Sequence, residues 1–590
     1  MDTEVRYHRE LVAIDGDLAR PYPSLDRLEN STLYIDADKP YLSAESYLSD
    51  DHAFYIDEEN DLIYLRSTKD PNSSKIEVGK RDGLLSISGN YVVLKGITFK
   101  HDASFENSFS SISGEAVSLS GKYLLVEDCN MIDNGSDGIV FSPGSDLLVR
   151  RGDFSNNGRI GIGLRRTYTR AYFEGINVSY NHWRSDLGHY TAPDLSGFGK
   201  VMFSNRIYLE NSTIQYHKNT GIWFDAQNMD ITLDNCYFTQ NNGALWFEIN
   251  ALNLGLINSS VYDNNVVGVR LDSESIYLYN NVMSQSSLDG AWGVLATLYY
   301  PKREGQIVPD VYMAKWLTLK SNIIAVSSGS GKIMRYDNSD IIGATATSTD
   351  NIFYASPVQN RIYTLHVLSF TDWQNSFNDT TSQLVDSYPF INDASATVSF
   401  KDSSISVDEN QTTLQIPIVL SKAVDANISV DLTVSGGIGA TENDDFKVLN
   451  GDKVIFRPLE RKKYVTVIVN RDYEDEALEE FTLTLSNPIN ASLGIHDVIT
   501  VAINASNEVL TQATQKIVNA YNRIEAENPD DYYEINFIDN VGFGRFRKNH
   551  WAMYSNVDFG VTSPTTVEVS IAVPEDGDCE TTHLVSPLKS

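Results

Sequence analysis

Residues 221–225 read Gly-Ile-Trp-Phe-Asp and residues 244–248 read Ala-Leu-Trp-Phe-Glu, so one short pattern returns after 23 positions. A third copy, Gly-Val-Arg-Leu-Asp, occupies residues 268–272, and two earlier copies end at Ser142 and Arg165. One short strand per repeat, at a fixed period in the twenties, is typical of a solenoid built from stacked coils. The pattern therefore predicts short strands on neighbouring coils, with equivalent residues lying one above the other.

Asparagine recurs at the expected turns, at Asn211, Asn235, Asn258 and Asn281. Asparagine adopts left-handed turn conformations more readily than most residues, and its amide can hydrogen-bond from coil to coil. We therefore expect an asparagine ladder inside the solenoid, a device of parallel β-helices.

Alternation within each copy separates two sets of side chains. The second and fourth residues are apolar in all five copies and should fill the core: Ile139, Phe141, Ile162, Leu164, Ile222, Phe224, Leu245, Phe247, Val269 and Leu271. The third and fifth residues should then point outward: Val140, Ser142, Gly163, Arg165, Trp223, Asp225, Trp246, Glu248, Arg270 and Asp272. The candidate chemistry lies in this outward set.

Asp225 and Glu248 occupy the same place on consecutive coils, where neighbouring strands lie about 4.8 Å apart. Retaining glycosidases hold two carboxyls about 5 to 5.5 Å apart, and inverting enzymes about 6.5 to 9.5 Å. We therefore expect Asp225 to be a nucleophile and Glu248 a general acid/base. Asp272 follows one coil later, so Glu248 lies between two acids, which should raise its pKa.

The surroundings of this pair supply further candidates. The two tryptophans could stack on sugar faces, although ladders of stacked aromatic or acidic residues also occur as purely structural features of solenoids. An insertion at about residues 181–200 should form a loop on the binding face. The expected substrate-binding residues are Trp223, Trp246, Arg270, Asp272, Lys200, Arg165 and His182. We expect Lys200 to lie one coil before Asp225.

Composition narrows the classes of partner. The net charge of −33 repels nucleic acid and anionic membranes. The sequence has no run of 18 apolar residues, so no membrane span is expected. Its three cysteines, Cys129, Cys236 and Cys579, share no metal spacing and imply no disulfide framework. Residues 1–6 contain no hydrophobic signal core, so either an export signal was removed or the chain starts at an internal boundary. We expect a secreted or periplasmic protein.

The 590 residues should form several domains of an all-β protein. We expect a right-handed parallel β-helix, followed by an antiparallel β-sandwich and a partial β-sandwich. The expected boundaries are a β-rich cap at 1–83, the β-helix at 84–395, the sandwich at 397–505, a linker at 506–520 and the partial module at 521–590.

The sandwich resembles a Calx-β domain. The matching residues lie at 407–410, 443–446, 455–458 and 471–481. The resemblance implies that Ca²⁺ is held by oxygen ligands from Glu409, Asp445, Asp472 and Glu476. The alternative is that these acids are solvated surface residues.

The last segment resembles the first half of a family 6 carbohydrate-binding module. Residues 524–528, Ile-Glu-Ala-Glu-Asn, and residues 549–559 carry that resemblance. It implies binding to sugar.

The coils resemble the catalytic β-helix of glycoside hydrolase family 120, the β-xylosidase group. Residues 221–228 and 246–248 carry the resemblance. It implies that Asp225 is the nucleophile, that Glu248 is the acid/base and that the substrate is a β-xyloside. Appended modules of this kind also accompany enzymes acting on marine galactans.

Two other functions are compatible with such a solenoid. A polysaccharide lyase would need a basic residue and charge neutralisation of a uronate, which Lys200, Arg165 and Arg206 could supply. A non-catalytic carbohydrate-binding surface protein would bind sugar without turnover. In each case the partner is a polysaccharide or an oligosaccharide, and catalysis needs no cofactor. The sequence does not indicate an oligomeric state.

Overall fold

A computed structural model describes most of the chain. The described residues are 11–15, 17–21, 49–57, 60, 62–70, 72–79, 81–104, 114–164, 168–183, 197–250, 252–285, 293–297, 316–327, 332–336, 346–356, 369–377, 379–391, 395–409, 413–449, 451–470, 478–504, and short strands between 518 and 558. The chain forms two compact units: the first holds residues 1–407, 411–470 and 478–503, and the second holds the remainder.

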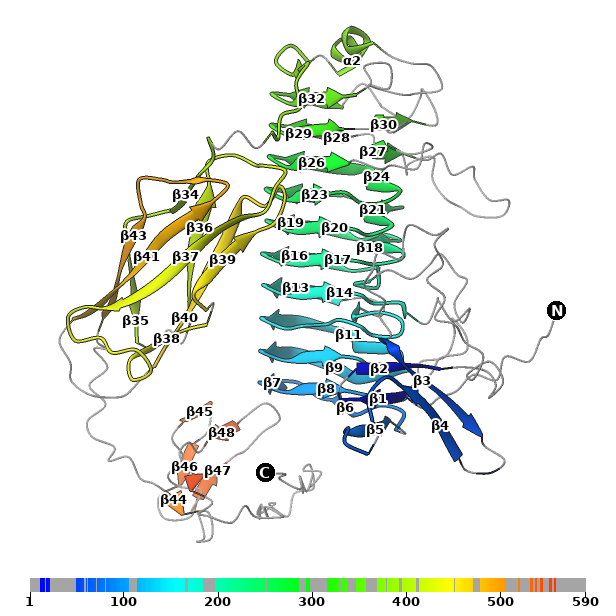
Figure 1. Ribbon diagram of the computed structural model, residues 1–590, viewed down its shortest axis with the longest axis vertical. Helices are drawn as coiled ribbons and strands as arrows, with labels where there is room; N and C mark the ends of the chain where they lie inside the picture. The colour runs from blue at the N-terminus through cyan, green and yellow to red at the C-terminus, as the bar shows by residue number, and fades with distance from the viewer. Residues whose placement is uncertain are drawn as a thin grey trace. The chain divides into compact units, whose positions relative to one another are not determined.

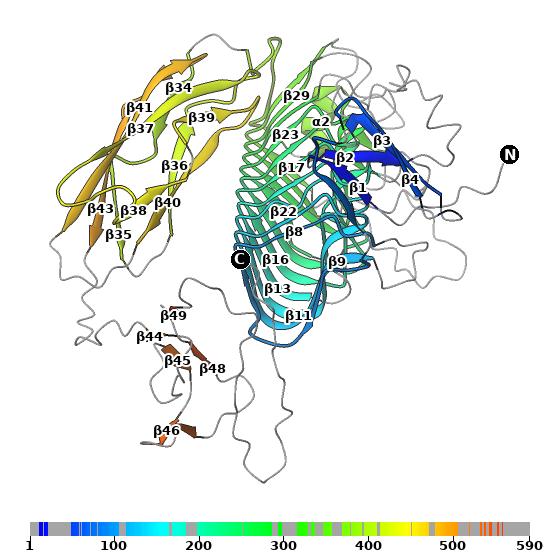
Figure 2. The same ribbon diagram turned by 60° about the horizontal axis from the view of Figure 1, so that its bottom comes forward.

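The first unit contains a tall stack of coils with parallel strands, as the repeat predicts (Figure 1). Figure 2 shows the same coils closer to end-on. The largest sheet contains β6 (Leu85–Ser88), β9 (Glu115–Glu127), β11 (Asp137–Arg150), β13 (Tyr168–Glu174), β16 (Asn205–Glu210), β19 (Met229–Asp234), β22 (Leu254–Ile257), β25 (Ser275–Tyr279), β28 (Trp316–Lys320) and β31 (Thr347–Thr349). At its lower end, β7 (Val93–Lys95) pairs with β9, and β12 (Ile162–Leu164) pairs with β11.

Two more parallel sheets complete the coils. One contains β14 (Asn177–Ser179), β17 (Thr213–Gln215), β20 (Tyr237–Thr239), β23 (Ser260–Tyr262), β26 (Val282–Gln285), β29 (Ile323–Val326), β32 (Ile352–Ala355) and β33 (Gln383–Leu384), and β8 (Thr98–Lys100) pairs separately with β10 (Asn130–Ile132). The other, which we call the site sheet, contains β15 (Lys200–Met202), β18 (Thr220–Asp225), β21 (Gly243–Glu248), β24 (Val267–Asp272), β27 (Gly293–Thr297) and β30 (Lys332–Tyr336). The all-β fold class with a parallel β-helix is confirmed.

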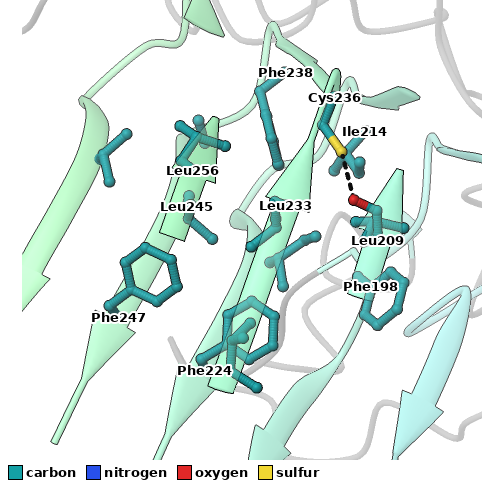
Figure 3. Packing of buried hydrophobic residues seen from close by; sticks show 14 of the residues in the cluster. Phe198, Leu209, Ile214, Phe224, Leu233, Cys236, Phe238, Leu245, Phe247 and Leu256 are labelled. Atoms are coloured by element: carbon teal, nitrogen blue, oxygen red, sulfur yellow. Dashed lines mark hydrogen bonds between the residues drawn. The ribbon is translucent and has the colours of Figure 1, made fainter. Parts of the chain in front are cut away.

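The interior of the coils is filled by the residues that alternation assigns to it. Ile222, Phe224, Leu245 and Phe247 are each at most 1% exposed. Figure 3 shows Phe224 and Phe247 among the labelled side chains of the buried cluster. The ring centroids of Phe224 and Phe247 are 5.7 Å apart. Each buried side chain of this size contributes roughly 1.5 to 3 kcal/mol. These buried residues therefore hold the coils together, and because they alternate with the outward residues, they also set the direction in which the outward residues point.

Asparagines form ladders, but the prediction that Asn211, Asn235 and Asn258 lie inside the solenoid was wrong, because these three are half-buried or exposed at the outer turns. A buried ladder is built by other asparagines, such as Asn241, whose amide donates to Asn264 at 2.9 Å. Asn211, Asn235 and Asn258 all have positive φ angles, near 50°. The next member of this outer ladder is Asn280, whose amide donates to Asn258 at 2.8 Å. Asn281 instead lies inside the coil and hydrogen-bonds to Asn322. The prediction that Asn281 continues the turn series was wrong by one residue, because that coil is one position shorter.

The ends of the stack are built differently. Near the N-terminus, five strands form a separate sheet in the order β4 (Leu62–Ser67), β3 (Ser49–Asp57), β2 (Asp17–Pro21), β1 (Leu11–Ile14), β5 (Ile76–Gly79). Near the last coils, α2 (Phe370–Phe377) buries Trp373 against Phe353, with ring centroids 5.4 Å apart. Ser369 and Asp372 exchange hydrogen bonds at the start of this helix, which satisfies its first amide groups.

The described strands between residues 397 and 504 form the β-sandwich. One sheet has the order β38 (Phe446–Val448), β40 (Lys462–Val469), β36 (Thr413–Leu420), β34 (Thr397–Phe400), β42 (Ser492–Leu493). The other has the order β35 (Ser404–Asp408), β43 (Val498–Asn504), β41 (Glu479–Ile489), β37 (Ile428–Gly436), β39 (Lys453–Phe456). Alternating residues such as Val465, Val467, Leu483 and Val501 are fully buried between them, so the sandwich is also confirmed.

Among its described residues, the second unit holds three short two-stranded ladders. They pair β44 (Val518–Asn519) with β49 (Val557–Asp558), β45 (Asp531–Tyr533) with β48 (Trp551–Met553), and β46 (Asn536–Ile538) with β47 (Gly542–Gly544). Across the part of the chain that the structure describes, no helix has the length and apolar character needed to cross a membrane.

Candidate active site

The site sheet places the predicted residues in two adjacent columns. Asp225 pairs with Glu248, and Glu248 pairs with Asp272, so three carboxylates lie on three consecutive coils. The column beside them contains Lys200, Trp223, Trp246 and Arg270 in the same order. Both columns alternate with the buried residues of β18, β21 and β24, so the core fixes which way they point.

Lys200, Trp223, Trp246 and Arg270 form a single stack. The Lys200 ammonium lies 4.0 Å from the Trp223 ring centroid. The two indoles are stacked with centroids 4.2 Å apart and planes 10° apart, and the Arg270 guanidinium lies 3.5 Å from the Trp246 ring. Cations over aromatic faces are attracted by the ring quadrupole. We call this group the cation–indole stack.

The cation–indole stack covers the ring faces on which the two tryptophans were expected to bind sugar. Trp223 is 3% exposed and Trp246 is 9% exposed, and the two outer ring faces are covered by Lys200 and Arg270. A sugar ring would have to displace a cation to stack on either indole. The arrangement therefore favours a supporting role over the sugar-stacking role expected from the sequence.

Each indole instead donates a hydrogen bond to a carboxylate on the following coil. Trp223 Nε1–H donates to Glu248 Oε2 at 2.9 Å, and Trp246 Nε1–H donates to Asp272 Oδ2 at 3.0 Å. Sequence reasoning missed this role. The signal was present in the repeated Trp-Phe-acid pattern, because an indole has a donor and no acceptor and an acid two residues later repeats at the coil period.

The two cations also pair with acids. Lys200 Nζ lies 2.7 Å from Asp225 Oδ2, and Arg270 Nη2 lies 2.8 Å from Asp272 Oδ2. Lys200 belongs to the preceding coil, as expected, but it pairs in register with Trp223, and Met202 lies opposite Asp225. The lysine side chain crosses from one column to the other.

Glu248 is the acid without a cation partner among these pairs, and it is buried. Its residue exposure is 7%. The pKa of Glu248 is raised to about 7, because burial and the Asp225 and Asp272 charges, which raise it, outweigh Arg270 and Lys200, which lower it. A carboxyl with this pKa holds its proton near neutral pH and can also release it, as a general acid/base must.

Tight turns fix the strand ends that carry the pair. Ala226 and Gln227, directly after Asp225, have φ angles of 55° and 62°, and Ile249, directly after Glu248, has a φ of 54°. A β-branched residue in this region is strained, and such strain clusters at functional sites. Asn228 holds the first turn, because its amide donates to the Asp225 carbonyl at 2.8 Å.

The remaining predicted substrate-binding residues lie elsewhere or outside the described residues. His182 is buried, and burial lowers its pKa to about 4. The charged groups that act on it are Lys218, Arg159 and Asp137, none of which belongs to the carboxylate column. Arg165 lies outside the described residues.

The described part of the sandwich contains two of the four expected calcium ligands. Glu409 is 3% exposed, and the Asp445 carboxylate accepts the Thr441 amide at 2.6 Å. Asp472 and Glu476 lie outside the described residues. Among the described positions, no group of three acidic, histidine or cysteine side chains could hold a metal ion. The calcium site therefore stays a prediction, and no step is derived through the ion.

Family models match both folded regions. Residues 72–185 and 116–283 match the model of the right handed beta helix region. Residues 392–508 match the model of the Calx-beta domain. The chain therefore contains a right-handed β-helix followed by a Calx-β domain. No curated protein matches this chain.

Solved structures show more distant likenesses. CBD12 from CALX1.2 is 24% identical over 18% of this chain and 44% of that one, with a TM-score of 0.18, so this chain spans less than half of its length. The complex of XylC with xylose is 11% identical over 80% of each chain, with a TM-score of 0.49. Pectate lyase Pel9A is 12% identical over 46% of this chain and 66% of that one, with a TM-score of 0.32. All three scores lie below 0.5 and carry no weight for function.

Proposed function

We propose that this protein is a secreted retaining glycoside hydrolase that cleaves a plant or algal polysaccharide, or its oligosaccharides. The observation that carries the proposal is the register pair of Asp225 and Glu248, of which Glu248 is buried with its pKa raised to about 7. Adjacent parallel strands separate such carboxyls by about 5 Å, which suits retention.

In the first step, Asp225 Oδ1 attacks the anomeric carbon and the glycosidic bond breaks. Glu248 gives its proton to the departing oxygen, so the products are a glycosyl ester on Asp225 and a neutral alcohol. Lys200 engages Oδ2 of Asp225, which directs the other oxygen towards the sugar. In the second step, the Glu248 carboxylate takes a proton from water, the water oxygen attacks the anomeric carbon, and Asp225 is released. Two inversions give net retention.

The charge on Glu248 suits both steps. Burial and the nearby Asp225 charge keep Glu248 protonated before the first step. Once Asp225 is esterified, its negative charge is gone, so the pKa of Glu248 falls and the ionised form becomes the base. One residue can then serve as acid and base in turn.

The charges of the site favour a neutral sugar. Lys200 and Arg270 are each paired with a carboxylate. With Glu248 protonated, the positive and negative charges of the group cancel, which leaves no excess positive charge for a uronate. This balance argues against a lyase, and a β-xyloside or a galactan-type glycoside is the substrate class that we propose.

Hydrolysis of a panel of aryl glycosides and of seaweed and plant polysaccharides tests the proposal. The wild type should release sugar with retained configuration, which ¹H NMR of the first product detects. Asp225→Ala should abolish hydrolysis of a reactive aryl glycoside, and activity within about tenfold of wild type would remove Asp225 from its role. Unsaturated uronate products, seen by ultraviolet absorbance, would identify a lyase, and sugar binding without turnover would identify a binding protein.

A further inference from the structure

The bond between Trp223 and Glu248 joins a fixed donor to a titrating carboxyl. An indole N–H can donate and cannot accept. It meets Oε2 of Glu248 at 2.9 Å, and both residues are buried. In a protonated carboxyl the carbonyl oxygen is the better acceptor, so the oxygen that receives the indole hydrogen is the one without the proton.

We propose that Trp223 is a positioning residue that keeps the acid proton of Glu248 on Oε1, the oxygen that must face the departing group. This inference rests on the proposed role of Glu248 as the acid/base. In this role Trp223 determines which of the two chemically equivalent oxygens of Glu248 carries the proton. Without the indole hydrogen bond, about half of the protonated molecules would hold the proton on the oxygen turned away from the substrate.

The cation–indole stack makes this donor rigid. Trp246 covers one face of Trp223 at 4.2 Å, and Lys200 covers the other at 4.0 Å. The N–H lies in the plane of the ring, so its direction is set once the ring is clamped. A stack of this kind costs little reorganisation at the moment of reaction, which is the condition for an effective preorganised donor.

Trp246 provides a matched control within the same stack. Its N–H reaches Asp272 Oδ2, which also receives Arg270. Asp272 therefore keeps a cationic donor when the indole bond is removed, and the Trp223–Glu248 bond is untouched. Trp223→Phe and Trp246→Phe each remove one N–H and keep an aromatic ring in the stack.

Two readouts distinguish positioning from general damage. The first is the dependence of kcat/KM on the leaving group, because poor leaving groups need the proton and 2,4-dinitrophenolate does not. Trp223→Phe should lower kcat/KM for an alkyl or phenyl glycoside by about twofold, because about half of the protons then sit on the wrong oxygen, and should leave kcat/KM for the dinitrophenyl glycoside unchanged. Trp246→Phe should show no such leaving-group dependence.

The second readout does not depend on activity. The Glu248 carboxyl can be titrated by ¹³C NMR, with Glu248→Gln used to identify its resonance. Loss of a hydrogen bond to the ionised form should raise the pKa of Glu248 by about one in Trp223→Phe and leave it near the wild-type value in Trp246→Phe. If no glycoside is hydrolysed, this titration still decides whether the indole acts on Glu248.

A double substitution and an isostere complete the test. Trp223→Phe should not slow Glu248→Gln further on the dinitrophenyl glycoside, because the indole acts through Glu248. Replacing Trp223 by 3-benzothienylalanine keeps the bicyclic ring and removes only the donor, so it should reproduce the effects if the Phe variant folds poorly. An unchanged pKa of Glu248, equal losses for all leaving groups, or the same behaviour in Trp246→Phe would overturn the proposal.

Discussion

Replacing Glu248 by Gln should stabilise the β-helix above pH 7 while removing the acid that we propose for catalysis. The two side chains have nearly the same shape, so the packing against Trp223 is kept. What changes is that the amide cannot ionise. Glu248 is 7% exposed, and an ionised carboxyl at that depth is poorly solvated.

The magnitude follows from the raised pKa of Glu248. Its ordinary pKa is 4.5 and its pKa in the folded protein is about 7, with burial as the largest cause. The folded state therefore holds this proton more tightly than the unfolded chain does. Below pH 4.5 both states are protonated, and the carboxyl then has no pH-dependent cost. As pH rises from 4.5 to 7 the wild type loses about 3 kcal/mol of stability relative to Gln, at about 1.4 kcal/mol per pKa unit.

Denaturant unfolding of both proteins at pH 4.5, 6 and 8 measures this difference. Other titrating groups are common to the two chains, so they cancel in the comparison. The Gln variant should gain about 3 kcal/mol over the wild type between pH 4.5 and pH 8. In parallel, kcat/KM of the wild type should fall with rising pH through about 7, and that basic limb should be absent from the variant. A stability difference that does not change with pH would refute the argument that Glu248 is buried and protonated near neutral pH.

Three further outcomes are expected. Azide should rescue Glu248→Ala on an activated glycoside and give a glycosyl azide of retained configuration, and an azide of inverted configuration would contradict the spacing between the carboxyls. Phe224→Ala should destabilise the β-helix by about 3 to 5 kcal/mol in denaturant unfolding. Val93→Ala, at a coil residue 60% exposed, should change its stability by about 0.5 kcal/mol or less, and equal effects would show that the coil core is misassigned. Calcium should raise the melting temperature of the wild type by several degrees in a calorimetric scan, and Asp445→Ala should abolish that rise. A rise that the substitution leaves unchanged would remove Asp445 from the expected site.

The fold could be predicted from the sequence because two simple regularities coincide. The coil period sets which residues stack, and alternation sets which of them are buried. Ile222, Phe224, Leu245 and Phe247 meet both conditions, and all are buried. The predicted register was wrong at Asn281, because the coil there is shorter by a single residue. Asn280 and Asn281 could each continue a ladder, so the sequence did not show which of them does.

The candidate site was predictable as a list of residues but not as a set of bonds. The repeat placed Asp225 and Glu248 side by side, and the structure has that register. The repeat alone could not show that Lys200 covers Trp223 while reaching Asp225, because the direction of a side chain depends on its rotamer, which the spacing does not determine. For the same reason, the indoles were expected to face sugar, although they are covered by cations and turned towards acids.

The stacking of coils has a consequence for how the proposed active site could change. Asp225 and Glu248 belong to consecutive rungs, so the gap between them is quantised in steps of one strand separation, about 4.8 Å. Duplication of a single rung between them would widen the gap to roughly 9.5 Å, at the far end of the inverting range. In such a scaffold, the number of coils between the two carboxyls would decide between retention and inversion. One tandem duplication of a coil could therefore change the stereochemical outcome without adding a new chemical group.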